Sequence, residues 1–162
     1  MQERKKNRLT EYDYSQDGVY YITICTQDRR CILSRIHSGN EWERSSVELS
    51  ELGQIVADVL TELSEQYGIR LEACSVMPNH IHLILFTENS EIKVGRFVGA
   101  VKSVAANRWR KICESRNVLM GKIWQRDYYD HILRNEADYL EKLKYIDENL
   151  DKWMQDELYG KW

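Results

Sequence analysis

The sequence has little proline, few phenylalanines and no long apolar run. Its 162 residues include one proline, Pro78, and four cysteines that form no Cys-x-x-Cys pair. Because no stretch of about 18 apolar residues occurs, we expect no transmembrane helix. The first eight residues are too polar for a secretory signal. We therefore expect a cytoplasmic protein whose cysteines are reduced and mostly buried, not paired in disulfides or bound to zinc.

An excess of positive charge is also missing, and the net charge of −3 argues against a protein that coats nucleic acid in general. The charge is nevertheless uneven. Basic side chains are dense in the first eight residues and again between residues 93 and 116, where Glu114 is the only acid. A protein that contacts a few phosphates needs a local basic patch rather than a basic chain. The pattern predicts phosphate contact, although solvated helix faces would produce the same pattern.

Strand-like and helix-like segments alternate without a linker or an internal repeat, which predicts a single domain over residues 1–162. Residues 1–10 are expected to form a flexible basic N-terminus. Strands are predicted at 19–26, 71–77, 80–86 and 123–133, and helices at 52–67, 94–112 and 136–153. Ser50 is suited to cap the start of the first helix and Gly68 its end. The fold class is α+β, a mostly antiparallel sheet with helices packed on it.

The segment 77–86, Met-Pro-Asn-His-Ile-His-Leu-Ile-Leu-Phe, carries the most chemical information. Successive side chains of a strand point to opposite faces, so His80 and His82 share one face and Ile81 and Leu83 take the other. Two adjacent imidazoles form half of a divalent-metal site. A single His-x-His pair is nevertheless more often structural than metal-binding, so its interpretation depends on the rest of the chain.

The last predicted helix supplies a second observation. At 100° per residue its apolar side chains form one arc, which consists of Tyr139, Leu140, Leu143, Ile146 and Leu150. Tyr145 lies off this arc, and Asn149 is its neighbour one turn later. A deprotonated tyrosine can attack phosphorus, and an ion held by His80, His82 and the Asn149 carbonyl could neutralise the developing charge. The rival nucleophile, Tyr139, falls on the apolar arc.

These residues resemble the HUH-superfamily single-tyrosine transposases, and most closely the branch of REP-associated tyrosine transposases. The resemblance spans nearly the whole chain in the order of the family. It is carried by the segments 12–15, 20–26, 77–82, 101–103, 124–136 and 145–153.

The resemblance implies a ferredoxin/RRM-like sheet of the HUH endonuclease type and a metal-dependent transposase. It places His80 and His82 as ligands of Mg²⁺ or Mn²⁺, Asn149 as the third ligand, and Tyr145 as the nucleophile. In such enzymes the tyrosine attacks single-stranded DNA near a hairpin, which leaves a 5′-phosphotyrosine link and a free 3′-hydroxyl, and a reversal of this step rejoins the strand. The implied partner is single-stranded or hairpin DNA. Some relatives form homodimers that share active sites.

Four further residues are candidates for contacting DNA. Lys102 matches a recurrent Lys-Ser pair of the family and could hold a phosphate, and Arg96, Arg126 and His131 are weaker candidates. One departure concerns the residue after Asn149, where the family usually has proline and this chain has Leu150. Because proline there would help to end the helix, we expect the helix to continue to Trp153.

Two other functions fit parts of the sequence. An inactive or domesticated relative would bind hairpin DNA without cutting it. An RRM-like RNA-binding module would explain a small sheet with exposed aromatic residues. The chain lacks the Lys/Arg-Gly-Phe/Tyr signature of that module, and an RRM needs no paired histidines.

Overall fold

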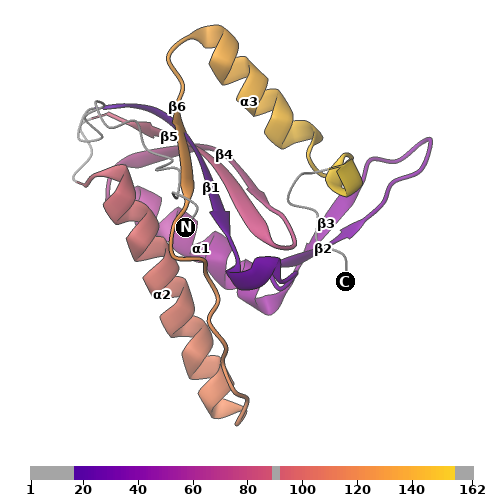
Figure 1. Ribbon diagram of the computed structural model, residues 1–162, viewed down its shortest axis with the longest axis vertical. Coiled ribbons are helices and arrows are strands. Elements are labelled where there is room, and N and C mark those ends of the chain that lie inside the picture. The colour runs from indigo at the N-terminus through magenta and orange to yellow at the C-terminus, as the bar shows by residue number, and fades with distance from the viewer. Residues whose placement is uncertain (1–16, 89–91, 156–162) are drawn as a thin grey trace, which may run out of the picture.

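The computed structural model describes residues 17–88 and 92–155, which form one sheet, three α-helices and a small hairpin (Figure 1). The prediction of a flexible N-terminus at 1–10 lies outside the described residues. The elements in chain order are β1 (Gly18–Cys25), η1 (Gln27–Arg29), β2 (Ser34–His37), β3 (Ser46–Leu49), α1 (Glu51–Gln66), β4 (Ile69–Val76), β5 (His80–Thr87), α2 (Val94–Ser115), β6 (Tyr129–Ile132), α3 (Glu136–Glu148) and η2 (Trp153–Gln155). No described helix is long and apolar enough to span a membrane.

The main sheet has the strand order β4-β5-β1-β6, and each neighbouring pair in it is antiparallel. Along the chain these strands alternate with α1 and α2 in the order β1-α1-β4-β5-α2-β6. This is the βαββαβ arrangement of ferredoxin-like domains. The predicted fold class, an α+β domain with a mostly antiparallel ferredoxin/RRM-like sheet, is therefore confirmed.

The two faces of the sheet are covered by different helices. Alternate residues of the central strands, among them Ile22 and Leu83, pack with α1 and α2 in the larger core cluster. The opposite residues, among them Tyr21 and Ile84, pack with Ile146 of α3. Figure 1 shows α3 on the side of the sheet away from α1 and α2. Because His80 and His82 share the face of Ile84, both imidazoles lie on the α3 side.

The predicted helix ends follow from local capping. The Ser50 hydroxyl accepts a hydrogen bond from the Gly53 N–H at 3.0 Å, and α1 starts directly after it. Gly68 follows α1 with a φ of +63°, a conformation that glycine adopts without steric cost. At α3, the Asn135 side chain accepts from the Asp138 N–H at 2.9 Å. The sequence thus predicted these boundaries correctly.

Two predicted boundaries are wrong. The strand expected over 123–133 is reduced to β6 and one isolated bridge between Thr26 and Trp124, because the carbonyls of the intervening segment are turned toward the ammonium of Lys102. Helix α3 ends at Glu148 instead of continuing to Trp153. The chain turns after Asn149, which is 2% exposed. This turn brings Trp153 to a buried position against the ring of His80.

The β2–β3 hairpin was not foreseen. Its strands are short and mostly exposed, so the sequence shows no clear alternation there. In Figure 1 it projects from the body of the molecule. The residues just before β3 contact α3 and the turn that follows it. The Ser45 N–H donates to Asp151 Oδ1 at 2.9 Å, and Arg44 lies 3.9 Å from Asp147. The hairpin thereby braces the segment that carries Tyr145.

The cysteines are all free, as expected, but they are not mostly buried. Only Cys113 is buried, Cys74 is exposed, and Cys25 and Cys31 are half-buried. Cys74 is exposed on the edge strand β4, although it pairs with the buried Leu83 of β5.

Candidate active site

The centre of the site is the pair His80 and His82 on β5. Their Nε2 atoms are 2.9 Å apart and their ring centroids are 4.4 Å apart. The two residues are 0% and 2% exposed. The predicted placement of both imidazoles on one face of one strand is thus correct, and their Nε2 atoms converge on a common point.

Asn79 holds the ring of His80. The Asn79 side-chain nitrogen donates to the carbonyl of Arg29 at 3.3 Å, which leaves its oxygen to accept from Nδ1 of His80 at 2.7 Å. Burial, and secondarily the charge of Arg29, lower the pKa of His80 to about 3. The imidazole is therefore neutral near pH 7, with its proton on Nδ1 and the lone pair of Nε2 directed at His82.

Two hydroxyl groups of β1 hold the ring of His82. Nδ1 of His82 lies 2.8 Å from the Tyr21 hydroxyl and 2.9 Å from the Thr23 hydroxyl. The Tyr21 ring also stacks on the imidazole, with centroids 5.5 Å apart. Hydrogen bonds to the outer nitrogen orient a metal-binding histidine, and these two hydroxyls hold the ring of His82 with its Nε2 toward His80.

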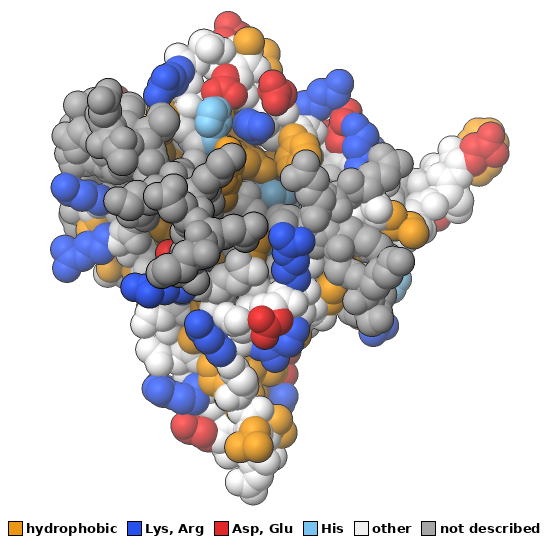
Figure 2. Space-filling model, viewed as in Figure 1, with side chains coloured by type: hydrophobic (Ala, Val, Ile, Leu, Met, Phe, Trp, Pro, Cys, Tyr) orange, Lys and Arg blue, Asp and Glu red, His pale blue; other side chains and the backbone are white. Residues whose placement is uncertain are grey.

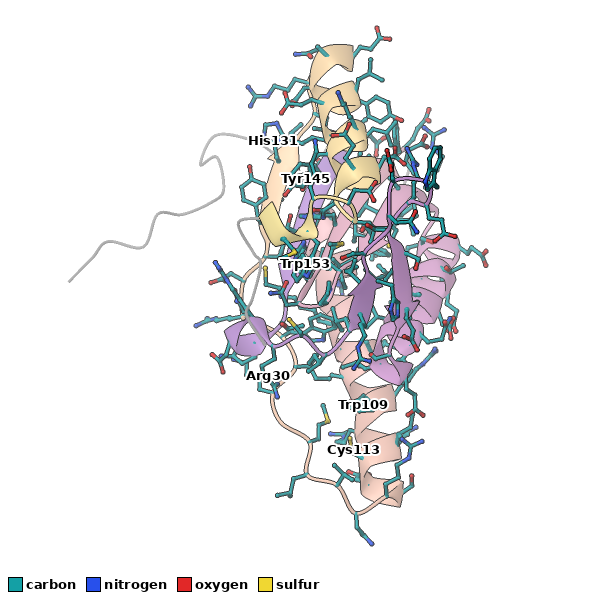
Figure 3. The ribbon with its side chains drawn as sticks, turned by 90° about the vertical axis from the view of Figure 1, so that its right-hand side faces the viewer. Arg30, Trp109, Cys113, His131, Tyr145 and Trp153 are labelled. Atoms are coloured by element: carbon teal, nitrogen blue, oxygen red, sulfur yellow. The ribbon has the colours of Figure 1, made fainter. Side chains whose placement is uncertain are left out.

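Helix α3 places Tyr145 over this pair. The centroid of its ring is 5.3 Å from that of His82 and 6.4 Å from that of Tyr21. The residue is 41% exposed, and its ring makes an edge contact with that of the histidine. On the other side, the Trp153 ring lies 5.9 Å from that of His80. Figure 3 shows Tyr145 on α3 and Trp153 in the segment that follows.

Asn149 lies between these two contacts in the chain, four residues from each. It is 2% exposed, and its side-chain nitrogen is buried without a hydrogen-bond partner. Within residues 17–88 and 92–155, no group of three or more His, Cys, Asp or Glu side chains could hold a metal ion. Asn149 stays the predicted third ligand, which would bind through its side-chain oxygen, and an oxygen donor of this kind suits Mg²⁺ or Mn²⁺.

The spacing of the two imidazoles also fits such an ion. Adjacent ligands of an octahedral ion with bonds of about 2.1 Å lie about 3.0 Å apart. The Nε2 atoms are separated by 2.9 Å. The two imidazole nitrogens are therefore spaced as two ligands of a hard divalent cation would be.

A comparison with protein families gives the site a context. The family model described as "Transposase IS200 like" matches residues 15–149, which include the histidine pair, Tyr145 and Asn149. The chain belongs to this family.

Individual relatives agree with this assignment. The chain is 27% identical to an uncharacterized protein of Haemophilus influenzae over 177 residues, which cover 96% of this chain and 93% of that protein. It is 23% identical over 139 residues to a candidate REP-associated tyrosine transposase of the same organism, covering 83% of this chain and 70% of that protein. The resemblance to this branch is thus supported by a sequence relative.

Two solved structures share the fold. One is a REP-associated tyrosine transposase bound to a REP hairpin, with a TM-score of 0.66 and 20% identity over 90% of this chain and 74% of that one. The other is a candidate transposase of Deinococcus radiodurans, with a TM-score of 0.54 and 21% identity over 87% of this chain and 95% of that one.

Two other tyrosines of this IS200-like transposase approach the α3 side of the sheet. The Tyr139 hydroxyl donates to Glu72 at 3.1 Å, and partial desolvation together with this bond raises the pKa of Tyr139. A bonded hydroxyl with a raised pKa makes Tyr139 the weaker candidate, and the choice of Tyr145 as the nucleophile stays a prediction. Tyr129 is 43% exposed and its ring lies 6.4 Å from that of Tyr21. It is a rival that sequence reasoning missed, because the pairing of β6 with β1 has no visible sequence signal.

The predicted DNA contacts lie in different parts of this transposase. Arg96 is exposed on the first turns of α2, and Arg126 is exposed in the segment before β6. His131 lies on β6, where its Nε2 is 2.8 Å from Asp138 Oδ2, so it fastens β6 to α3. Their roles toward DNA stay predictions. For two other basic residues of α2 and its end, Arg108 and Arg116, a role on the protein surface is favoured over phosphate contact. Each forms paired hydrogen bonds with a glutamate of α1.

Lys102 has a structural position instead of the predicted phosphate contact. Its ammonium donates to the carbonyls of Gln125, Arg126 and Asp127 at 3.0, 3.2 and 3.2 Å. The three donors of the ammonium are thereby used. Burial lowers the pKa of Lys102. The residue shapes the segment that leads into β6, and it presents Arg126 on the surface.

We expect Lys102→Met to lower the free energy of unfolding by about 1 to 2 kcal/mol, because three carbonyls lose a charged donor. Lys111→Met serves as the control, since Lys111 is exposed on the same helix. Urea denaturation of both variants measures the difference. Equal stability of the two variants would contradict the structural role of Lys102.

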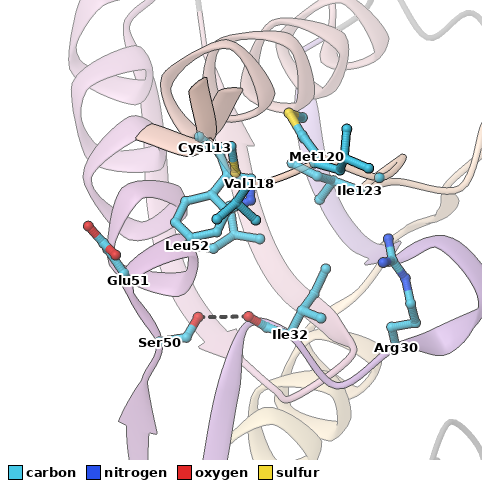
Figure 4. Close-up of a pocket in the computed structure, with 12 residues that line it drawn as sticks. Arg30, Ile32, Ser50, Glu51, Leu52, Cys113, Val118, Met120 and Ile123 are labelled. Atoms are coloured by element: carbon cyan, nitrogen blue, oxygen red, sulfur yellow. Dashed lines mark hydrogen bonds between the residues drawn. The ribbon is translucent and has the colours of Figure 1, made fainter. Parts of the chain in front are cut away.

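A cavity of about 310 Å³ lies away from the histidines (Figure 4). It is lined mainly by apolar residues of α1, of the end of α2 and of the segment 118–123, among them Leu52, Trp109 and Val118. It opens on the side of the sheet that α1 and α2 cover. This cavity is thus separate from the histidine site.

Proposed function

We propose that this chain cleaves and rejoins single-stranded DNA flanked by a hairpin, through a 5′-phosphotyrosine intermediate on Tyr145. The observation that carries this proposal is the position of Tyr145, whose ring lies 5.3 Å from that of His82 in the same chain. An accessible phenol beside two converging imidazoles supports phosphoryl transfer. The relative of similar fold that is bound to a REP hairpin supports hairpin DNA as the substrate class.

The reaction conserves phosphodiester bonds. The Tyr145 phenol, with an ordinary pKa of about 10, loses its proton, and the phenolate oxygen attacks phosphorus. The bond from phosphorus to the 3′ oxygen breaks, and that oxygen takes up a proton as a free 3′-hydroxyl. The 5′ side of the DNA remains on Tyr145 as a phosphodiester. Attack by a 3′-hydroxyl of another end reverses the step and releases Tyr145, so no external energy source is needed.

His80, His82 and Asn149 would hold Mg²⁺ or Mn²⁺ in this proposal. Such an ion, when bound, supplies positive charge that neutralises the phosphate oxygens during attack. Asn79 and the hydroxyls of Tyr21 and Thr23 contact the outer nitrogens and keep the two imidazoles oriented. A cytoplasmic location, as the sequence predicts, is part of this proposal.

The RNA-binding alternative is less compatible with the fold. An RRM presents aromatic residues on an open sheet face, onto which bases stack. Here α3 packs on the sheet face that carries the histidines, through Ile146 and Tyr145. The alternative of an inactive relative that binds hairpin DNA has no structural observation in its favour, and the experiment below separates it from the enzyme.

A denaturing gel tests the proposal. The protein is incubated with a pool of labelled DNA hairpins that have varied single-stranded flanks, with Mn²⁺ or with a chelator. We expect a slowly migrating covalent band that requires Mn²⁺. Hairpin binding without such a band would favour the non-cutting relative, and an absence of both band and binding would contradict the proposed function.

Because Tyr145 lies over the histidines of its own chain, one chain is expected to form one complete site, even if it associates as a homodimer. Mixing Tyr145→Phe with His82→Asn protein should then produce no more covalent band than either variant alone. Recovery of the band in the mixture would show that the tyrosine serves the partner's histidines, and would contradict the single-chain site.

A further inference from the structure

The turn after β1 has an unusual backbone. Asp28 and Arg29 in η1 have φ values of +56° and +54°. Two consecutive left-handed residues that are not glycine are uncommon, and such strain tends to be kept where a protein uses it. The turn lies directly beyond Cys25, which pairs with His80 across the sheet.

Hydrogen bonds tie this turn to the histidine strand. The Asn79 side chain donates to the Arg29 carbonyl at 3.3 Å and accepts from His80 at 2.7 Å. The Thr26 hydroxyl lies within hydrogen-bond distance of the carbonyls of Asn79 and Arg30, at 3.0 and 2.8 Å. The same asparagine therefore fixes both the ring of His80 and the backbone of Arg29. A ligand held by the Arg29 side chain would have a fixed position relative to His80.

The two arginines of the turn differ in role. Arg30 donates to the carbonyls of Gln27 and Lys122, so it braces the turn against the segment before β6. The Arg29 side chain is exposed, and the carbonyl of the same residue is held by Asn79.

The surface around the turn is mainly basic. Lys122 and Arg126 are exposed in the segment before β6, whose residues bridge to Thr26 and Gln27 of the turn. Figure 2 shows Lys and Arg side chains, interspersed with acidic ones, on the region of this face where η1 and that segment lie. This basic region therefore adjoins the turn that Asn79 ties to His80.

We propose that Arg29 binds a backbone phosphate of the single-stranded DNA and thereby sets the position of that strand relative to His80. The inference rests on the proposed function for the identity of the ligand. The planar guanidinium suits a phosphate, to which it can donate two parallel hydrogen bonds. The strained turn fixes the backbone of Arg29 before the DNA arrives, which lowers the ordering cost of binding.

Binding of DNA tests this inference in the Tyr145→Phe background, where no covalent step intervenes. The probe is the tightest-binding hairpin of the pool, measured by fluorescence anisotropy over a range of salt concentrations. We expect Arg29→Asn to weaken binding roughly fivefold at low salt and to reduce the slope of log affinity against log salt by about 0.7, the value for one phosphate of a single strand. Asparagine tolerates the left-handed backbone, so this change removes the charge without adding strain.

Two variants serve as controls. Arg29→Lys keeps the charge and should largely preserve the salt slope, although it loses the paired hydrogen bonds. Arg110→Gln removes an exposed arginine of α2, behind the sheet, and should leave both affinity and slope unchanged.

A methylphosphonate scan then locates the phosphate. Replacing the DNA phosphates one at a time by neutral methylphosphonates should reveal one position that weakens binding to the parent protein but not to Arg29→Asn. An unchanged salt slope in Arg29→Asn, or an unchanged pattern in the scan, would contradict the inference alone. Failure of the parent protein to bind any hairpin would contradict the proposed function as well.

Discussion

Tyr145→Phe is expected to abolish the covalent protein–DNA band, which corresponds to a loss of about 10³-fold or more in the rate of cleavage. The change removes only the hydroxyl. The phenyl ring can keep its packing on His82 and Tyr21, at 5.3 and 6.4 Å between centroids. The variant should therefore retain its fold and its affinity for hairpin DNA. Gel assays and urea denaturation measure the two properties separately.

The matched controls are the other tyrosines of this face. Tyr129→Phe removes the exposed rival, and Tyr139→Phe removes a hydroxyl that is bonded to Glu72. Both variants should keep most of the covalent band. A normal band in Tyr145→Phe together with its loss in Tyr129→Phe would assign the nucleophile to β6 and would overturn the account of α3.

His82→Asn is expected to abolish both metal binding and cleavage. The change removes one of the two imidazoles, so that the Nε2 atom of His80 is the only imidazole nitrogen left at the site. Loss of a hydrogen bond that supports a ligand usually weakens metal binding 10- to 100-fold. Loss of the ligand itself should weaken Mn²⁺ binding by at least as much. Isothermal titration with Mn²⁺ measures this effect without DNA.

The control for this prediction is Thr23→Val, which removes one of the two hydroxyls beside Nδ1 of His82. Because the Tyr21 hydroxyl remains at 2.8 Å, we expect a smaller loss of Mn²⁺ affinity than in His82→Asn. If His82→Asn bound Mn²⁺ as tightly as the parent protein, the assignment of the histidine pair as ligands would be wrong.

The parts of the site that sequence could predict depend on local periodicity. Alternation along one strand places His80 and His82 together, and helical spacing places Tyr145 one turn before Asn149. The direction in which Tyr145 points was predicted less well. The helix buries only Ile146 fully, and Leu140 of the predicted apolar arc is 51% exposed. Three residues of the predicted arc, Tyr139, Leu143 and Ile146, do pack on this face of the sheet. Tyr145 meets the same face through the rings of His82 and Tyr21, although the prediction had placed it on the far side of the helix from Leu143.

The parts that sequence could not predict depend on strand register and on chain turns. Tyr21 and Thr23 contact His82 because β1 pairs with β5 at one specific register, with Thr23 opposite His82. Such a register has no signal in a single sequence. Asn79 lies beside His80 in the chain, but its role appears only once its side chain is seen between His80 and Arg29. A signal could have been found there, since an amide next to a candidate ligand is a natural partner for its outer nitrogen.

Trp153 and Lys102 show how tertiary contacts override local patterns. The α3 helix ends at Glu148 although no proline follows, and the turn carries Trp153 to the ring of His80. The segment before β6 was predicted to be part of a strand, yet the carbonyls of residues 125–127 accept hydrogen bonds from the Lys102 ammonium. In both cases a contact made by a distant residue decides the backbone path.

The central claim is that one chain joins Tyr145 to DNA at a site built around His80 and His82. Mass spectrometry of the covalent product tests it most directly, because trypsin separates the rival tyrosines of this face into different peptides, 127–134, 135–142 and 145–152. The account predicts a 5′-nucleotide phosphate on Tyr145 when Mn²⁺ is present. A nucleotide on Tyr129 or Tyr139, or a product linked through the 3′ side of the DNA, would contradict it.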